Sequence, residues 1–312
     1  MKIVRYTIEY KQQWDTFLDG AKNGHFFFKR EYIEYHSDRF TEHSLLIFND
    51  KDKLISLLPA NIYENVLYSH QGLTFGGFIL DREIKTLQVL EMFELLYDYL
   101  KENTIVKMLY KAIPSIYHTM PSEEDRYALF RLNAKLIRRD ISSTIALSSD
   151  FKYSKLRKRV IAKAKKEHLE ILKSDNYQEF WTLLRELLSV EHQVEPVHAL
   201  EEIEYLAEKF RENIKLYVVK KENKLVAGTV IYENRTIVHT QYLANSKEGK
   251  SIGALDILLD HLIAITYKDK HYFDFGISTE NGGRYLNSGL ISQKEGFGAR
   301  GIVHDFYELE IV

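Results

Sequence analysis

The hydrophobic positions in the first half of the chain follow the order helix, short strands, helix, strand. A helical stretch surrounds Trp14, Phe17 and Leu18. Farther along, hydrophobic residues recur three and four positions apart over 87–100, which is the spacing of one helix face. The strand-like runs between and after these helices cover 44–48, 53–58, 65–68 and 105–110.

The second half repeats this order with more helices at its start. One helix carries five aliphatic residues on a single face: Leu255, Leu258, Leu259, Leu262 and Ile263. Short polar links between the strands before it are typical of hairpins, whereas the longer strand–helix–strand links indicate parallel pairing. The other predicted helices cover 153–166, 177–190 and 201–210, and the predicted strands cover 215–220, 224–232, 235–243, 272–277 and 302–311.

The repeated order predicts an α/β protein with a mixed sheet in each half. The chain has 312 residues, enough for two domains, and its four prolines and fifteen glycines form no segment of linker composition. We therefore expect two tandem units that pack on each other, residues 1–140 and 141–312, with the active site in the second.

Composition restricts the chemistry. A net charge of −2 gives no overall field that would draw the chain onto DNA or anionic lipid. The absence of cysteine excludes disulfides, thiolate metal ligands and a cysteine nucleophile. Residues 1–10 lack the apolar core of a signal peptide, and no apolar run approaches the roughly 18 residues of a membrane span. We expect a soluble cytoplasmic protein with no membrane span and no bound metal.

The closing segment, residues 271–298, joins a hydrophobic strand to a polar, glycine-rich loop. Strand alternation places Asp274, Gly276 and Ser278 on one face and the aromatic residues on the other. A buried carboxylate must be paired, and glycine lets the backbone approach a ligand closely. The polar groove that we predict at this strand end is lined by Asp274, Ser278, Glu280, Asn281 and Lys294.

Another polar pair lies in the predicted strand 235–243. Alternation puts His239 and Gln241 on one face and Thr240 and Tyr242 on the other. A histidine here could act as a general base, and a structural, hydrogen-bonded histidine fits the same position. His198, in a predicted helix-entry loop, either reaches the active site or helps to cap the helix.

The segment 152–166 carries eight basic residues and no acidic one. It is either a solvated helix face or a site for phosphate on a nucleotide, a lipid carrier or tRNA. Arg157 is the candidate ligand because a guanidinium can hold phosphate in a bidentate manner.

The segment 244–253 joins a strand to a helix and contains glycine, serine and lysine. Free backbone N–H groups and the helix dipole would suit phosphate at such a helix start. The alternative is a polar strand–helix turn without a ligand.

The closing segment resembles that of the Fem-type acyltransferases, which carry the GNAT acyltransferase fold twice in one chain. The resemblance rests on the strand with Asp274, on Lys294 and on the pair Phe297–Gly298, although Gln293 stands where the family has phenylalanine. The basic segment and residues 69–77 are also similar to parts of these proteins. The resemblance implies two tandem GNAT-like units, with Lys294 at the acyl-transfer site.

The resemblance also implies that the 244–253 loop cradles the pyrophosphate of acyl-coenzyme A. The family's signature begins with Arg or Gln and ends with Gly or Ala, whereas this chain has Lys250 and Leu255 at those positions. The cofactor-binding residues implied in this way are Lys247, Gly249, Lys250, Ser251 and Gly253.

The activity that the resemblance implies is transfer of an acyl group from acyl-coenzyme A to an amine, such as an amino sugar of a surface-polysaccharide precursor. The amine would attack directly, with Lys294 stabilising charge and with His239, Asp274 or Glu280 as base or relay. The predicted substrate contacts are Arg157, His198, Gln241, Tyr242, Ser278 and Asn281.

Two other interpretations stay open. One is a Fem-like aminoacyl transferase that uses aminoacyl-tRNA, although the chain has no sustained heptads for the coiled-coil insertion that many such proteins carry. The other is a non-catalytic module that binds a nucleotide or a sugar on the same fold.

Overall fold

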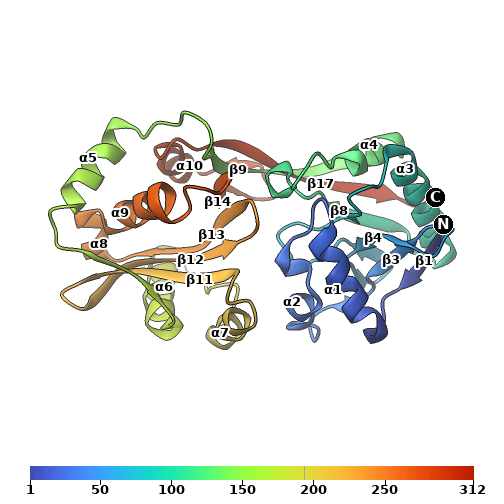
Figure 1. Ribbon diagram of the computed structural model, residues 1–312, viewed down its shortest axis with the longest axis horizontal. Helices are drawn as coiled ribbons and strands as arrows, with labels where there is room; N and C mark the ends of the chain where they lie inside the picture. The colour runs from blue at the N-terminus through green and yellow to red at the C-terminus, as the bar shows by residue number, and fades with distance from the viewer. Residues whose placement is uncertain (193) are drawn as a thin grey trace. The chain divides into compact units, whose positions relative to one another are not determined.

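A computed structural model describes residues 1–192 and 194–312 of the chain (Figure 1). The chain forms two compact units. The first comprises Met1–Asp140, Glu280–Tyr285 and Val303–Val312, and the second comprises Ile141–Thr279 and Leu286–Ile302. The sequence analysis expects two contiguous units, 1–140 and 141–312, whereas two later segments return here to the first unit.

The first unit contains short strands and four α-helices. Its elements are β1 (Lys2–Arg5), α1 (Lys11–Gly20), α2 (Arg30–Glu34), β2 (Thr41–Glu42), β3 (Leu45–Phe48), β4 (Leu54–Leu58), β5 (Asn61–Tyr63), β6 (Val66–Tyr68), β7 (Ile79–Leu80), α3 (Thr86–Glu102), β8 (Lys107–Lys111) and α4 (Glu124–Arg131), with 3-10 turns at Ile8–Tyr10, Phe26–Phe28 and Ser115–Tyr117.

The second unit contains longer strands and six α-helices among its described residues. Its elements are α5 (Lys155–Ala164), β10 (Glu170–Ser174), α6 (Tyr177–His192), α7 (Leu200–Lys209), β11 (Ile214–Lys221), β12 (Lys224–Glu233), β13 (Ile237–Asn245), α8 (Lys247–Ile252), α9 (Ala254–His261), the π-helical turn Leu262–Thr266, β14 (Tyr272–Ile277) and α10 (Ser288–Glu295).

Four strands have residues in both units: β9 (Lys135–Ala146), β15 (Thr279–Glu280), β16 (Tyr285–Leu286) and β17 (Arg300–Glu310). The hydrogen-bonded order is β10-β11-β12-β13-β14-β9 and continues as β17-β8-β6-β5-β2, with β1-β3-β4-β7 as a separate sheet and β15-β16 as a hairpin. The pairs β13–β14 and β6–β8 are parallel, so each half contributes mixed pairing, as predicted. The sequence predicts a separate sheet for each half, whereas the strand order passes through β9 and β17.

The core of the first unit forms around α3. This helix buries Val89, Met92, Phe93 and Leu96, residues three and four apart, in one hydrophobic cluster with the strands. Tyr110 completes the cluster, and its hydroxyl donates to Asp125 Oδ2 at 2.7 Å and accepts from the Phe78 N–H at 2.8 Å. A buried tyrosine hydroxyl is therefore satisfied on both sides.

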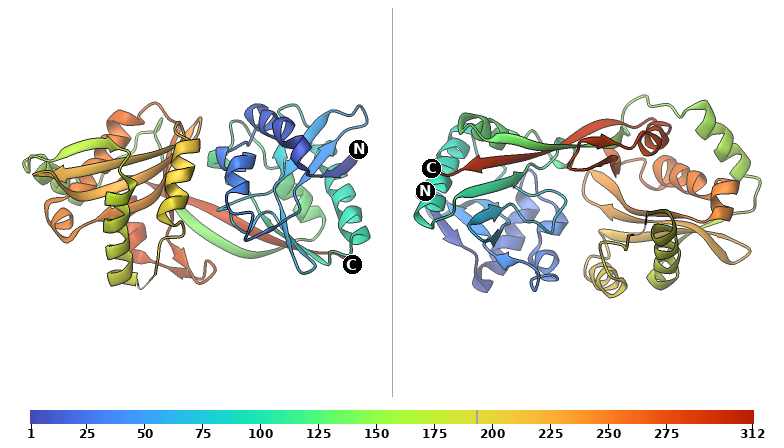
Figure 2. Two further views of the ribbon diagram at one scale, coloured as in Figure 1. Left: turned by 90° about the horizontal axis from the view of Figure 1, so that it is seen from below. Right: turned by 180° about the vertical axis from the view of Figure 1, so that it is seen from behind.

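In the second unit, helices cover both faces of the strands β11–β13 (Figures 1 and 2). The predicted aliphatic face of α9 lies in the core with Val226, Ile231 and Val238. On the other face of the sheet, α6 packs against β13 and α7 against β11. The prediction from the 3.6-residue period is confirmed for α9.

Two elements, β9 and α10, were not predicted from the sequence. Strand β9 contains Arg138, Arg139 and Asp140, which interrupt the hydrophobic pattern and resemble a loop. Residues 288–295 form the helix α10 instead of a glycine-rich loop. Among the described residues, no helix is both long and apolar enough to cross a bilayer.

We predict that Gly253→Ala lowers the free energy of unfolding by about 2–5 kcal/mol. Gly253 has φ +78°, which is strained for alanine, and an added Cβ would lie 2.7 Å from Val160 Cγ1. Denaturant unfolding with linear extrapolation measures the loss.

The matched control is Gly282→Ala, where φ is +62° but no atom lies within 4 Å of an added Cβ. It should lose only the backbone penalty of about 1–2 kcal/mol. Equal losses in the two variants would contradict close packing of α5 against Gly253.

Candidate functional site

The parallel strands β13 and β14 pair over only three residues. Their register joins Ile237 to Tyr272, Val238 to Phe273 and His239 to Asp274. Beyond this point β13 runs on beside β12 to Asn245, and β14 runs on beside β9. The two strands therefore separate directly after His239 and Asp274, toward their carboxyl ends, which is where α/β sheets commonly bind ligands.

A histidine–carboxylate pair occupies the point of separation. His239 Nδ1 lies 2.7 Å from Asp274 Oδ2. The other oxygen of Asp274 accepts hydrogen bonds from Ser142 Oγ at 2.5 Å and Thr144 Oγ1 at 2.7 Å. Because an ionised carboxylate only accepts, Nδ1 of His239 carries a proton and donates it to Asp274.

The two side chains of this pair differ in their exposure to solvent. Asp274 is fully buried, whereas the His239 side chain is 17% exposed. A buried carboxylate needs its three donors, and the sheet supplies them from β9 and β13. The pair thus presents a fixed imidazole at the edge of the strand opening.

Gly276 makes room for the imidazole ring. Its φ is +77°, and an added Cβ would lie 3.0 Å from His239 Cε1. The register of β14 with β9 shifts between Asp274 and Ile277, so one extra residue is accommodated here. The alternation predicted for Asp274, Gly276 and Ser278 therefore fails beyond Asp274.

Lys294 holds the same turn from α10. Its ammonium donates to the carbonyl oxygens of Gly276 at 2.8 Å and Ile277 at 2.7 Å. The residue is only 5% exposed, and burial lowers the pKa of its ammonium to about 8, although Asp274 opposes that shift. The structure thus brings Lys294 and Asp274 to one turn, and a direct contact between Lys294 and substrate stays a prediction.

A β-bulge in β13 moves Tyr242 to the face that carries His239. Thr240 pairs with Ile231 but Tyr242 pairs with Val230, so Gln241 is the extra residue. The prediction that Thr240 and Tyr242 share a face is therefore wrong. A single inserted residue reverses the alternation beyond it.

Tyr242 fixes the loop before α7. Its hydroxyl lies 2.5 Å from His198 Nδ1 and accepts from the His198 N–H at 3.3 Å. Burial raises the pKa of Tyr242 to about 12. Glu202 caps the helix start by accepting from the Ala199 N–H at 2.7 Å, and His198 is buried against Tyr242.

The remaining candidates from the closing segment are divided between the two units. Ser278 is buried in the second unit, and its Oγ has no hydrogen-bond partner among the described residues. Glu280 and Asn281 belong to the first unit, and both are exposed. The groove that would join them to Lys294 stays a prediction.

Arg157 forms an internal ion pair. Its guanidinium donates to Asp256, and its Cζ lies 5.4 Å from the centre of the Phe297 ring. The Arg157 guanidinium therefore already has partners within the second unit, which argues against its predicted role as a phosphate ligand. They also link α5 to α9.

The predicted coenzyme A loop is a capped helix, α8. Ser246 Oγ accepts from the Gly249 N–H at 2.9 Å, and the Lys250 N–H donates to the Ser246 carbonyl at 2.8 Å. An added Cβ at Gly249 would lie 2.3 Å from the Val226 carbonyl oxygen, so this glycine serves packing against β12. The N–H groups of Gly249 and Lys250 are therefore used within the helix, as is the Ser251 hydroxyl, which donates to the Glu248 carbonyl.

Ser142 and Thr144 are the functional candidates that the sequence analysis missed. Both lie on β9, which was not predicted as a strand, and both are buried. The polar run Ser142–Ser143–Thr144 beside a hydrophobic residue was the only signal available in the sequence.

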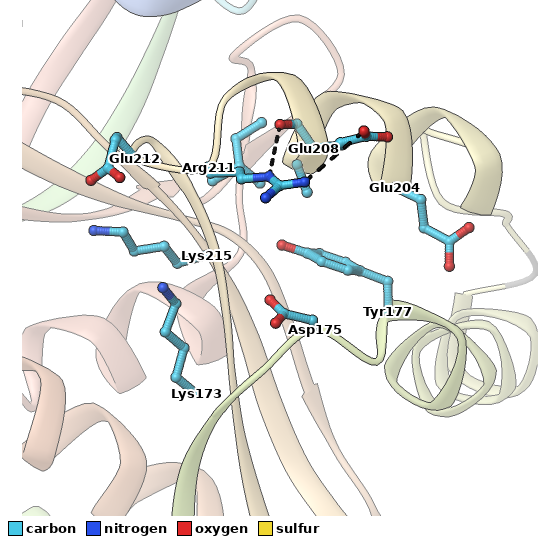
Figure 3. Close-up of a pocket in the computed structure, with 10 residues that line it drawn as sticks. Lys173, Asp175, Tyr177, Glu204, Glu208, Arg211, Glu212 and Lys215 are labelled. Carbon is cyan, nitrogen blue, oxygen red and sulfur yellow. Dashed lines mark hydrogen bonds and ion pairs between the residues drawn. The ribbon is translucent and has the colours of Figure 1, made fainter.

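A separate polar pocket of about 630 Å³ lies between α7 and the strands β10 and β11 (Figure 3). Lys173, Asp175, Tyr177, Glu204, Arg211 and Lys215 are among its lining residues. Its charges are mixed, and Arg211 is already bound to Glu208 on the same helix end. Nothing in this pocket adds to the His239–Asp274 pair. Within the described ranges, no group of three or more His, Asp or Glu residues could hold a metal ion.

We predict that Thr144→Val lowers the free energy of unfolding by about 1.5–3 kcal/mol, because it removes one donor from a buried carboxylate. Thr240→Val is the matched control, since the Thr240 hydroxyl is buried without a hydrogen-bond partner among the described residues. That control should be neutral or stabilising in the same denaturant experiment. A larger loss for Thr240→Val than for Thr144→Val would contradict the assignment of donors.

We also predict that Lys294 titrates near pH 8, which NMR of the lysine Cε and Nζ signals measures. Because its folded pKa lies below the ordinary 10.5, the unfolded state binds more protons between pH 8 and 10.5, and stability rises with pH in that window. The total rise is about 3 kcal/mol. Lys111 has a similarly lowered pKa of about 8, so the contribution of Lys294 is the difference between wild type and Lys294→Met. A difference that is flat over this window would contradict the prediction.

The fold is the one seen in several solved structures. FemX aligns over 99% of this chain and 97% of its own, with a TM-score of 0.69 and 9% sequence identity. The C-terminal domain of a putative lysylphosphatidylglycerol synthetase from Agrobacterium fabrum aligns over 97% and 92%, with a TM-score of 0.64 and 10% identity. L-PGS from Bacillus licheniformis aligns over 90% and 91%, with a TM-score of 0.60 and 13% identity.

No protein-family model matches the chain, and no curated protein matches it. The similarity therefore concerns the fold. It confirms the Fem-like fold that the resemblance implied, because FemX shares this fold along nearly the whole chain.

Proposed function

We propose that the protein is a transferase that moves an acyl or aminoacyl group onto an amine, with His239 as the general base. The observation that supports this proposal is the His239–Asp274 pair at the point where β13 and β14 separate. Such a pair fixes the ring and its tautomer, so that Nε2 can accept a proton from a substrate placed in the opening.

The reaction needs one base and no side-chain nucleophile. The amine nitrogen attacks the carbonyl carbon of an ester or thioester, and Nε2 of His239 takes the proton that the nitrogen loses. The tetrahedral intermediate collapses by breaking the bond to the leaving oxygen or sulfur, which receives that proton from the imidazolium. Asp274 stabilises the transient positive charge on the ring.

Lys294 supports this chemistry from behind the turn. Two of its three N–H donors are directed at the carbonyls of Gly276 and Ile277, which keeps the glycine turn beneath the imidazole. Its positive charge adds to the field that stabilises an oxyanion near the site. Both effects fit the charge-stabilising role that the sequence suggests.

The class of acyl donor separates two versions of the proposal. The version with acyl-coenzyme A needs α8 to bind the pyrophosphate. The backbone N–H groups of Gly249 and Lys250 already donate to Ser246 in this helix. The shared fold supports the other version, with an aminoacyl donor such as aminoacyl-tRNA. One protein with this fold is named as a putative lysylphosphatidylglycerol synthetase, and lysyl is an aminoacyl group. The amine acceptor, such as an amino sugar, is common to both versions.

The experiment offers the purified chain acetyl-coenzyme A or a mixture of aminoacyl-tRNAs, each with a panel of amino sugars and their nucleotide-linked forms. Mass spectrometry detects the amide product. An amide formed from either donor supports the proposal and identifies the version. Binding of an amino sugar without product from any donor would favour a non-catalytic module.

We predict that His239→Gln lowers kcat/KM by about 10²–10⁴-fold, the usual effect of removing a general base. The same substitution at His271, which is exposed in the same unit, provides the control and should leave kcat/KM unchanged. Steady-state kinetics across pH measure both variants. Retention of full activity in His239→Gln would remove this residue from the mechanism and leave Asp274 with a structural role.

A further inference from the structure

Helices α5 and α8 form one charged surface in the second unit. Lys163 Nζ donates to the Ser251 carbonyl at 2.8 Å, and Gly253 packs directly against Val160. The basic segment and the 244–253 loop are predicted from the sequence as two alternative phosphate sites. The structure instead brings them side by side.

The helical geometry places several cations of α5 on the side that faces solvent. Ile161 and Ala164 are buried, so the opposite side of the helix faces solvent. Four exposed basic residues lie on or beside that side, and we call them the outer cations: Lys155, Lys158, Arg159 and Lys166. Those on α5 itself, Lys155, Lys158 and Arg159, extend over about 6 Å at a rise of 1.5 Å per residue, and Lys166 lies beyond the helix end.

Two other cations of the basic segment have acidic partners. Arg157 is paired with Asp256, and Lys165 lies 3.7 Å from Asp260. None of the four outer cations has an ion pair or a side-chain hydrogen bond among the described residues. The positive charge of the outer cations is therefore uncompensated within the described structure.

This arrangement costs the helix stability. The first turn of α5 contains no acidic residue, and its cations oppose the helix dipole. Lys155 and Arg159 are like charges four residues apart, which repel each other on the helix surface. A negatively charged partner would remove both penalties.

We propose that the outer cations dock the second unit onto an anionic lipid bilayer surface. The net charge of −2 for the whole chain gives no general attraction, so the local patch has to provide it. The patch is the convex side of a helix, which offers no convergent donors for one compact phosphate but matches an extended plane of headgroups.

One apolar residue beside the patch favours a bilayer over RNA. Leu156 is 49% exposed among these cations, and long lysine stems can spread along an apolar boundary while their ammonium groups stay in water. α5 itself contains no aromatic residue on which bases could stack. The proposal is independent of the transferase reaction.

The test is co-sedimentation of the whole chain with vesicles of phosphatidylglycerol mixed with phosphatidylcholine, and with vesicles of phosphatidylcholine alone. We expect binding to the anionic vesicles only, and weaker binding as salt rises. Each outer cation replaced by glutamine should weaken binding about fivefold. The quadruple variant of Lys155, Lys158, Arg159 and Lys166 should not sediment.

The matched control replaces four other exposed cations of the second unit by glutamine: Lys173, Arg211, Lys224 and Lys268. It loses the same net charge and should still bind. Thermal unfolding verifies that both variants are folded, and the outer replacements should not destabilise because they relieve repulsion. His239→Gln should bind vesicles as wild type does, whether or not the proposed reaction exists.

Three outcomes would overturn the proposal. They are equal binding to both kinds of vesicle, equal loss in the control variant, and binding to polyuridylic acid but not to the anionic vesicles. The last would identify the patch as a nucleic-acid surface.

Discussion

The second unit is organised around one buried carboxylate. Asp274 is removed from water inside the sheet, and a charge in that position is tolerated only when every oxygen is hydrogen-bonded. Three donors meet this need, and they come from β9 and β13, strands more than ninety residues apart in the sequence. The pairing of β9 and β13 beside β14 and the orientation of the imidazole both serve this one group.

Backbone irregularities then convert a regular sheet into a site. A bulge at Gln241 carries Tyr242 to the face of His239, and a register shift with positive φ at Gly276 makes room for the ring. Lys294 stabilises the second irregularity by binding the two carbonyls that it leaves turned toward α10. Burying that ammonium is unfavourable, as its lowered pKa indicates, so the turn is held at a cost in stability.

The cations of the basic segment differ in their partners. Inward cations such as Arg157 receive an acidic partner, because an unpaired charge beside the core is expensive. The four outer cations have no acidic partner among the described residues, because water solvates exposed charges at little cost. The run of eight basic residues in the sequence therefore contains both paired cations, such as Arg157, and the outer cations, which are unpaired among the described residues.

The sequence by itself determined the elements whose pattern is local: the aliphatic face of α9, the strand β14 and the repeated element order. It also identified Asp274, His239 and Lys294 as polar candidates for the site. It missed β9, because Arg139, Ser142 and Thr144 look like loop residues until their partners Asp305 and Asp274 are brought to them. Bulges and the burial of Lys294 were likewise decided by the tertiary structure. A register is a relation between two strands, and burial is a relation between distant segments, so neither is encoded in the period of one segment.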